Sequence, residues 1–337
     1  MDSITHIAFG AIVGEAIAGK RLGKRAMFLG AIAQSLPDID FVASFWLSAT
    51  DNVLVHRGFT HSFLFGVLAT VVLAAGSERW HRARAVPLWT WLLFWGSEIF
   101  LHLLLDACNA YGIGWFEPFS DVRFSFHILF VADPFFSAPL GIALAALMIL
   151  DSKKTFARRV WIYTALTISA AYFLYALNNK IRVDKATRAA LKSRQIEAER
   201  FFSTPTPLNS WLWYIVAETD SGFHAAYRSS LDEKPEMSFN YFPQRDELLA
   251  GMNDRRDVQQ LKEFSQGYYT VEIRTDTLIF NDLRFGQIAG WADPDGKFVF
   301  HYYLNYPEAN LMVIQRGRFS NWNEKTFRSM VRRMRGE

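Results

Sequence analysis

Apolar residues fill the first half of the chain in long runs that are separated by short basic clusters. Four runs are the clearest: Phe63–Gly76, Val86–Leu105, Ile128–Leu150 and Val160–Leu177. The longer ones reach the ~20 residues that a membrane-spanning helix needs. Two earlier runs, Ile4–Ala18 and Met27–Leu47, are interrupted by charged residues, histidine or proline. This pattern predicts a polytopic helical membrane domain over residues 1–179.

The second half of the chain, residues 180–337, contains no run long enough to cross a bilayer. Lys180–Arg200 has the composition of a charged helix that leaves the membrane, and Asp246–Phe264 has a helical pattern. Alternating stretches predict strands at Trp211–Glu218, Gly222–Ser229, Tyr268–Ile273, Thr277–Phe280 and Lys297–Leu304. The overall prediction is a mostly α protein whose membrane domain is followed by a small soluble α+β domain, which we expect to act as a lid or in substrate recognition.

Basic residues are concentrated in alternate connections between the apolar runs. These clusters are Lys20, Arg21, Lys24 and Arg25; then Arg79, Arg82 and Arg84; then Lys153, Lys154, Arg158 and Arg159. The positive-inside rule therefore predicts an N-terminus outside the cytoplasm, and six spans would put the C-terminal domain outside as well. The basic residues that follow Lys180 favour the alternative, in which five spans leave that domain in the cytoplasm.

Composition excludes several other classes of protein. The net charge of +3 is too small to suggest a nucleic-acid partner, and no zinc-finger spacing or phosphate-binding glycine loop is present. The single Cys108 excludes an intrachain disulfide. The start of the chain lacks the positive region of a cleavable signal peptide, so we expect the first apolar run to remain in the mature protein.

Acidic and histidine side chains gather in or beside the apolar runs of the first 110 residues. Seven of them are candidate metal ligands: His6, Asp38, Asp40, His56, His61, His102 and Asp106. Such groups are costly in a bilayer or a core unless something binds them, and a divalent cation is a common reason to collect them. His102 and Asp106 are four residues apart on one helical face, and Pro37 breaks a helix directly before Asp38 and Asp40.

The segment His56–Ser62 adds two histidines, Arg57 and two hydroxyls within seven residues. A guanidinium can bind a phosphate or carboxylate through two hydrogen bonds, which makes Arg57 a candidate substrate-binding and catalytic residue. In the alternative reading of this segment, Thr60 or Ser62 only caps the next helix.

Further polar residues are predicted to surround the same site. Asp2, Thr60 and Asp133 are expected to support the ligands, and Asn109, Tyr111 and Arg123 are expected to bind substrate.

Neutral imidazoles mixed with carboxylates, without cysteine, suit zinc, manganese or iron. Seven candidate ligands exceed what one tetrahedral ion takes, so we expect more than one ion. A pair of ions generates hydroxide at neutral pH and binds phosphoryl oxygens, which indicates phosphoester hydrolysis, with Asp40 and His61 joining Arg57 in the catalytic set.

Several of these segments resemble a known family. They are Asp2–His6, the LPDID run at Leu36–Asp40, the HRGFTHS run at His56–Ser62, the His102/Asp106 pair and the stretch Asn109–Asp133. Together they resemble the YdjM-like family of inner-membrane-associated, metal-dependent hydrolases over most of residues 1–180, and the HRGxTHS element is quite specific. The resemblance implies a multi-pass protein of the bacterial inner membrane with a metal site.

A looser likeness connects the order of histidines and aspartates with the zinc-dependent phospholipase C and S1/P1 nuclease group. That group completes its site with a histidine-xxx-glutamate element that is absent here. The likeness therefore does not imply a third zinc ion or the same catalytic arrangement in this chain.

The leading hypothesis is a metal-dependent phosphoesterase that acts on a lipid or lipid-linked substrate at the periplasmic side, with membrane lipids as its partners. One alternative is a non-enzymatic membrane protein whose metal braces broken helices while its C-terminal domain docks a partner. Another is a metal transporter, but transport predicts ligands in both halves of the membrane.

Overall fold

The computed structural model describes the whole chain except residues 82–85, 275, 307–309 and 311–321. Arg82 and Arg84 of the second basic cluster therefore lie outside the described residues. The chain divides into two compact units. The helical unit comprises Met1–Phe45, Val55–Tyr175 and Pro207–Asn209, and the sheet unit comprises Trp46–Leu54, Ala176–Thr206 and Ser210–Glu337.

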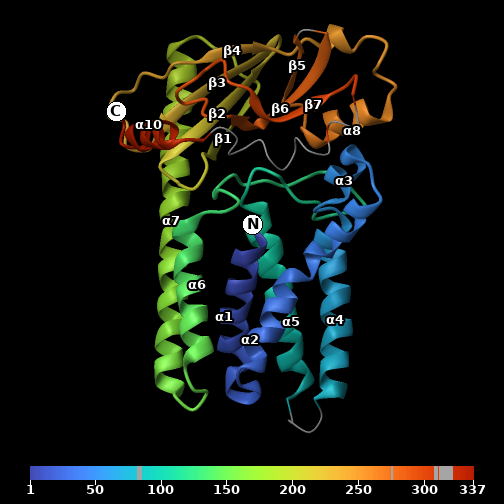
Figure 1. Ribbon diagram of the computed structural model, residues 1–337, viewed down its shortest axis with the longest axis vertical. Coiled ribbons are helices and arrows are strands. Elements are labelled where there is room, and N and C mark those ends of the chain that lie inside the picture. The colour runs from blue at the N-terminus through green and yellow to red at the C-terminus, as the bar shows by residue number, and fades with distance from the viewer. Residues whose placement is uncertain (82–85, 275, 307–309, 311–321) are drawn as a thin grey trace. The chain divides into compact units, whose positions relative to one another are not determined.

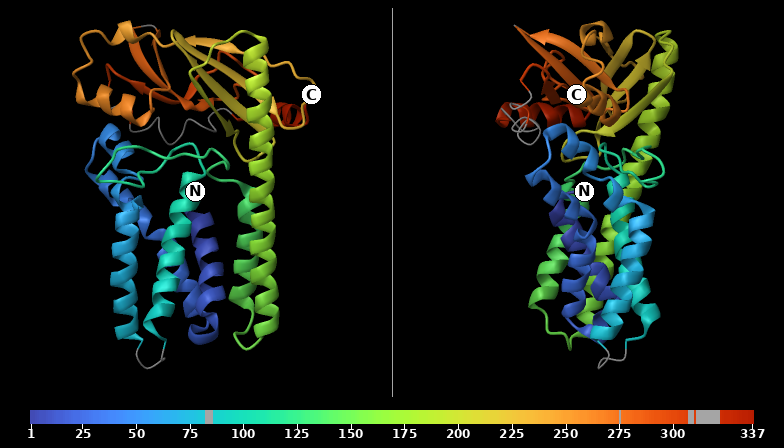
Figure 2. Two further views of the ribbon diagram at one scale, coloured as in Figure 1. Left: turned by 180° about the vertical axis from the view of Figure 1, so that it is seen from behind. Right: turned by 90° about the vertical axis from the view of Figure 1, so that its right-hand side faces the viewer.

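The helical unit is built from helices that run alongside one another (Figures 1 and 2). In chain order these are α1 (Ser3–Leu22), α2 (Arg25–Ser35), the 3-10 helix η1 (Pro37–Phe45), the 3-10 helix η2 (Phe59–His61), α4 (Phe63–Trp80), α5 (Leu88–Ala107), α6 (Pro134–Ile149) and the first half of α7 (Thr155–Ser193). The short helix α3 (Ala49–Val55) lies almost entirely in the sheet unit.

Among the residues that the structure describes, three helices are long and apolar enough to cross a membrane: α4, α5 and α7. A fourth span is added if α2 and η1, which meet at a bend of 57°, are one broken span. This bend lies at Pro37, where the sequence predicted a break.

Two of the predicted segments have different bounds in the structure. The run Ile128–Leu150 is helical only from Pro134, so α6 has 16 residues and is shorter than a typical span, because Asp133 caps its first turn. The predicted span Val160–Leu177 and the predicted charged helix Lys180–Arg200 form one continuous helix, α7, which ends at Ser193. No proline or glycine interrupts α7, so the change from apolar to charged composition does not break it.

Close contact between α1 and α2 depends on two glycines that face each other. A Cβ atom on Gly30 would lie 2.1 Å from the carbonyl oxygen of Gly10, and one on Gly10 would lie 2.3 Å from the carbonyl oxygen of Gly30. Small residues of this kind let helix backbones approach closely in membrane proteins. This approach brings His6 of α1 beside Gln34 of α2.

The described part of the sheet unit forms two antiparallel sheets. One has the strand order β1-β2-β3-β4 and the other β5-β6-β7. The strands are β1 (Arg200–Pro205), β2 (Leu212–Thr219), β3 (Gly222–Ser229), β4 (Asn240–Pro243), β5 (Tyr269–Arg274), β6 (Thr277–Gln287) and β7 (Phe298–Tyr303), and the helices are η4 (Asp246–Leu249), α8 (Arg256–Phe264) and α10 (Glu324–Met334). Side chains from both sheets, such as Val216, Phe223 and Leu283, share one core. The second half of α7 packs through Val183 and Ala190 on Trp213.

All five predicted strands are present, whereas β1, β4 and α10 were not predicted. β1 ends at Pro205, and it is an edge strand, where a proline is tolerated. The predicted helix Asp246–Phe264 is wrong as a single element, because Gly251 adopts a left-handed φ of 86° between η4 and α8.

We expect Gly30→Ala to lower the free energy of unfolding of the helical unit by about 1–3 kcal/mol, because the added methyl group overpacks the α1–α2 contact. Thermal unfolding in detergent measures the effect. Gly76→Ala in α4 is the matched control, since a Cβ atom there meets no atom within 4 Å. It should leave stability unchanged or raise it by up to about 1 kcal/mol. Equal behaviour of the two variants would contradict the proposed helix contact.

Candidate metal centre

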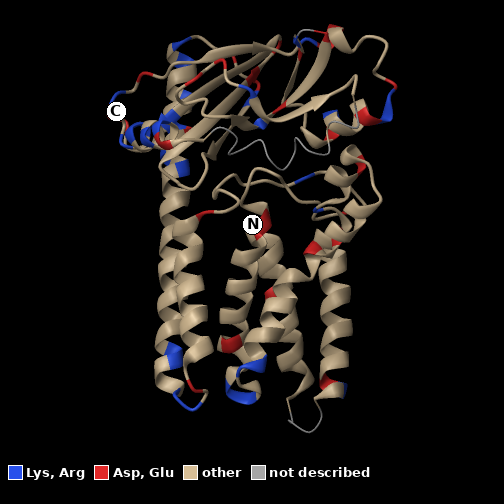
Figure 3. Cartoon of the chain, viewed as in Figure 1, with Lys and Arg blue, Asp and Glu red and all other residues tan. Residues whose placement is uncertain are grey.

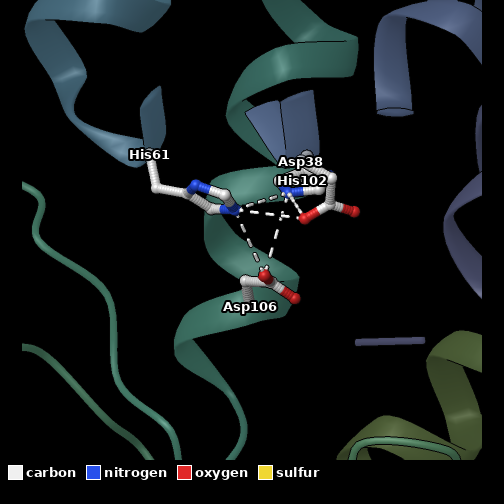
Figure 4. A group of neighbouring side chains, drawn as sticks. All are labelled: Asp38, His61, His102 and Asp106. Carbon is white, nitrogen blue, oxygen red and sulfur yellow. Dashed lines mark hydrogen bonds and ion pairs between the residues drawn. The ribbon is translucent and has the colours of Figure 1, made fainter. Parts of the chain in front are cut away.

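Four of the predicted ligands converge on one point in the helical unit. His102 and Asp106 project from α5, Asp38 from η1 and His61 from η2, as Figure 4 shows. One donor atom from each of the four lies within 4.8 Å of those of the other three. In the part of the chain that the structure describes, this is the one group of three or more such residues that could hold a metal ion.

The spacing of these donor atoms matches a coordination shell. His61 Nε2 lies 3.1 Å from His102 Nε2, 3.4 Å from Asp38 Oδ1 and 3.5 Å from Asp106 Oδ2. His102 Nε2 lies 3.7 Å from Asp38 Oδ1 and 3.8 Å from Asp106 Oδ2. Ligand atoms of a tetrahedral ion with bonds of about 2.0–2.1 Å lie about 3.3–3.4 Å apart, so the observed values are close to that spacing.

Outer partners leave both inner nitrogens without a proton. His102 Nδ1 lies 2.6 Å from the carbonyl oxygen of Gln34, which only accepts, so Nδ1 carries the hydrogen. His61 Nδ1 faces the Thr60 hydroxyl at 3.1 Å and a carboxylate oxygen of Asp40 at 3.5 Å. Burial lowers the pKa of His61 well below its usual range, so its ring is neutral. The two Nε2 lone pairs then face each other at 3.1 Å beside two carboxylates, an arrangement that a bound cation stabilises.

Burial of the cluster strengthens this conclusion. The side chains of His61, His102 and Asp106 are fully buried, whereas Asp38 is 22% exposed. The buried Oδ2 atom of Asp106 accepts no hydrogen bond of good geometry from the described residues, and its charge is paired with the Arg57 guanidinium, whose Nε atom lies 3.0 Å away. Its lone pairs remain available to a divalent ion at the centre of the group, which would stabilise the buried carboxylate further. The four residues therefore fit a metal ion, and Asp38 lies on the side of that site that is exposed.

His6, a predicted ligand, lies beside the four-residue group. Its Nε2 atom is 3.1 Å from Asp106 Oδ1, and its Nδ1 atom is 3.0 Å from Gln34 Oε1. Its ring stacks on that of His102, with 3.9 Å between the centroids. The Asp106 Oδ1 atom also contacts the amino group of Met1. In this arrangement His6 orients a ligand carboxylate rather than adding a donor to the group.

Asp40 and His56, also predicted as ligands, form an outer layer on the other side of His61. One Asp40 oxygen lies 3.2 Å from His56 Nδ1, and the other accepts hydrogen bonds from the Arg57 backbone N–H at 2.8 Å and the Thr60 hydroxyl at 3.3 Å. These bonds hold Asp40 against His61, the carboxylate–histidine–metal arrangement typical of metalloenzymes. Thr60 thus contacts both Asp40 and His61, while Ser62 caps α4 by accepting from the Phe65 N–H.

Arg57 reaches the cluster through an unusual backbone conformation. Its φ of 62° lies in the left-handed region, which costs free energy in a residue other than glycine. The conformation directs its N–H to Asp40 and its side chain to Asp106, whose Oδ2 atom is 3.0 Å from Arg57 Nε. Arg57 Nη1 donates to Asn109 Oδ1 at 2.8 Å, and the guanidinium lies 4.9 Å from the centre of the Tyr111 ring.

The remaining predicted residues lie farther from the four donor atoms. Asp2 caps α1 by accepting from the N–H and hydroxyl of Thr5. Asp133 caps α6 and accepts from the Tyr172 hydroxyl. Arg123 Nη1 donates to the carbonyl oxygen of His56. We find Asp2 and Asp133 acting as helix caps, because an aspartate directly before a helix satisfies its first backbone N–H groups.

Two buried residues of this region were not predicted. Gln34 connects His6 and His102 and donates from Nε2 to the carbonyl oxygen of Glu98. The Glu98 side chain is fully buried. The spacing could have indicated it, since Glu98, His102 and Asp106 follow one another at intervals of four on one face of α5.

Comparison with known proteins identifies the family of the chain. The family model of the YdjM inner membrane protein matches residues 1–181, which include all four donors of the cluster. The chain belongs to the YdjM inner membrane protein family. It is 36% identical over 123 residues to the inner membrane protein YbcI of Escherichia coli, covering 36% of this chain and 69% of YbcI.

A second relative matches a longer part of the chain. The chain is 27% identical over 232 residues to the uncharacterized protein YfhP of Bacillus subtilis, covering 66% of this chain and 67% of YfhP. No solved structure matches the chain.

We expect the purified protein to carry at least one divalent ion and His102→Ala or Asp106→Ala to lower its affinity by more than about 100-fold, because each removes a donor. Asp40→Asn should cost only about 10–100-fold, the range seen when an outer partner of a ligand is lost. Elemental analysis of detergent-purified protein and competition with a chelator measure both effects. His81→Ala, which changes a histidine outside the cluster, is the control. Equal losses for Asp40→Asn and His102→Ala would instead make Asp40 a direct ligand.

Proposed function

We propose that this protein is a membrane-bound, metal-dependent hydrolase, a phosphoesterase that acts on a lipid or lipid-linked substrate. The observation that carries this proposal is the convergence of two unprotonated imidazole nitrogens and two carboxylates on one point, 3.1–3.8 Å apart in the five measured pairs. Zinc bound by nitrogen and oxygen donors supplies an activated water at neutral pH. The predicted presence of more than one ion is part of the proposal.

Access to the cluster supports a catalytic rather than a closed site. Asp38 is the one partly exposed member, and His56, in the outer layer, is 37% exposed. A substrate can therefore approach from the side of η1. Zinc ions can expand from four to five ligands during a reaction, so a water or a phosphoryl oxygen can join the four protein donors.

Arg57 is the residue proposed to bind the anionic part of the substrate. Its guanidinium is 96% buried and lies next to Asp106, so it is close to a bound cation that would repel it. An anionic phosphoryl group placed between the ion and Arg57 would be attracted by both. The hydrogen bond to Asn109 and the ring of Tyr111 hold the guanidinium in this position.

A lipid substrate and a periplasmic active site are supported by the distribution of charge in the helical unit. Lys and Arg residues colour the ends of the helices where α1 meets α2 and where α6 meets α7, and these ends are opposite to the one at which the N-terminus lies (Figure 3). The positive-inside rule then favours a metal site at the non-cytoplasmic face, near the headgroup layer.

A second candidate function is a structural metal site without catalysis. Four protein donors are enough to fill a tetrahedral ion, as in structural zinc sites. In that case the ion would brace the bend between α2 and η1, and the enzyme assay would be negative in every condition.

A hydrolysis screen separates the two candidates. Metal-loaded protein is incubated with phospholipids and lipid-linked phosphates, and released phosphate or headgroup is measured. We expect turnover that is lost on chelation and reduced at least about 100-fold in Asp38→Ala, with Asp121→Ala, an exposed carboxylate outside the cluster, as the control. Absence of turnover, combined with a fall in melting temperature on chelation, would favour the structural site.

We expect Arg57→Lys to keep the metal content and to lower hydrolysis by about 10-fold or more, because the charge remains while the two-bond contact to a phosphoryl group is lost. Elemental analysis and the hydrolysis assay are done on the same preparation. If the metal is lost together with activity, Arg57 acts mainly by holding Asp106 in place. Asn109→Ala, which removes a partner of Arg57 but not of Asp106, should give a weaker version of the Arg57→Lys effect.

A further inference from the structure

A second polar cavity lies in the helical unit, at the end opposite to the metal cluster. It has a volume of about 550 Å³. Its walls come from the last turns of α1, the connection between α6 and α7, and the first two turns of α7. None of its lining residues belongs to the metal cluster.

The cavity is lined by four cationic side chains and one carboxylate. The cations are Lys20, Lys153, Arg158 and Arg159, and the carboxylate is Glu15. Ser152 and Thr155 add hydroxyl groups. The excess of positive charge suits an anionic ligand that can also accept hydrogen bonds.

Arg158 and Glu15 form the fixed wall of this cavity. Arg158 Nε donates to Glu15 Oε1 at 2.9 Å, and Nη1 donates to the carbonyl oxygens of Leu147 and Leu150 at 2.8 and 3.0 Å. The guanidinium therefore ties α1 to the end of α6 and the start of α7. The Arg158 side chain is only 4% exposed, so its donors and its charge are already paired with these protein groups.

The Glu15 carboxylate is turned away from solvent. It is 7% exposed and packs against Gly19, where a Cβ atom would lie 2.6 Å from the carboxylate carbon. Because Glu15 neutralises Arg158, the exposed cations Lys20, Lys153 and Arg159 determine the charge that a ligand meets.

Exposed apolar side chains near the α6–α7 connection, which are not part of the cavity lining, offer a surface for the hydrocarbon of a ligand. Ile149 is 86% exposed, Phe156 81% and Val160 49%, and all three flank the α6–α7 connection. The helix α7, to which Phe156 and Val160 belong, is one of the helices able to cross a membrane. A ligand with an anionic head and apolar chains would satisfy both surfaces, whereas a free phosphate would satisfy only the cations.

We propose that this cavity binds the headgroup of an anionic phospholipid such as phosphatidylglycerol. The phosphodiester lies between Lys20, Lys153 and Arg159, the hydroxyls of Ser152 and Thr155 donate to its oxygens, and the acyl chains run along Phe156 and Val160. Basic pockets between membrane helices are a known means of retaining anionic lipids. The site is independent of the proposed hydrolase, since it neither supplies nor requires a metal.

The test compares two triple variants of the full chain in detergent. The pocket variant carries Lys20→Ala, Lys153→Ala and Arg159→Ala. The control variant carries Arg25→Ala, Arg79→Ala and Lys154→Ala, which remove the same charge from exposed positions outside the cavity lining. Phosphatidylglycerol, phosphatidylcholine, inorganic phosphate and glycerol 3-phosphate are each titrated, and bound ligand is counted by native mass spectrometry. Metal content and melting temperature are recorded for every variant.

The expected result is saturable binding of phosphatidylglycerol by the unaltered protein and the control variant, with at least about tenfold weaker binding by the pocket variant and unchanged metal content. Equal loss in both variants would overturn the proposal, because the lipid would then respond only to total charge. Equal binding of phosphatidylcholine, or equally tight binding of glycerol 3-phosphate or phosphate, would overturn it too. If the pocket variant fails to fold, the single variants Lys20→Ala and Arg159→Ala are tested in its place. The site is rejected if neither single variant weakens phosphatidylglycerol binding.

Discussion

The helical unit is organised around two imidazole nitrogens that face each other without a proton between them. His61 and His102 each use their outer nitrogen for a hydrogen bond, so their inner lone pairs meet at 3.1 Å next to Asp38 and Asp106. Four acceptors in a largely buried place repel one another unless a cation is shared by all of them. The surrounding helices and turns hold the four donor atoms of Asp38, His61, His102 and Asp106 in this arrangement.

Several costly features of the fold serve this arrangement. The bend of 57° at Pro37 brings Asp38 out of a helix that would otherwise carry it away, and Arg57 adopts a left-handed backbone conformation beside the cluster. The close α1–α2 contact at Gly10 and Gly30 places His6 and Gln34 behind Asp106 and His102. A strained backbone conformation such as that of Arg57 persists only where many surrounding contacts hold it, and such conformations are common at functional sites.

The two ends of the helical unit differ in chemistry. One end collects acceptors that attract a cation, and the other collects lysines and arginines that attract an anion. At the cationic end a single guanidinium, that of Arg158, joins α1, α6 and α7 through hydrogen bonds. At the other end a metal would join η1, η2 and α5. Each end therefore has one polar centre that connects helices distant in sequence. Apolar contacts between helices in a membrane provide little directional specificity, so these polar centres help to fix how the helices are paired.

The sequence alone determined those features that depend on local pattern. Three of the four clear apolar runs are helices long enough to span a membrane, the break at Pro37 is present, and the spacing of His102 and Asp106 put both on one face of α5. Five strands of the sheet unit followed from alternation. These properties arise from periodicity and from the lack of an N–H in proline, which are properties of neighbouring residues.

Only the tertiary structure decided which of the seven candidate ligands meet. Four place donors in one group, His6 and Asp40 contact those four from outside, and His56 contacts Asp40. This sorting depends on distances between segments up to 100 residues apart. Gln34 joined the site without a motif, because its role comes from the packing of α2 on α5. The continuity of α7 and the strand at Pro205 likewise depended on neighbours in space. Sequence pattern fixes which face of a helix is polar, but the identity of the group opposite that face is a property of the packed chain.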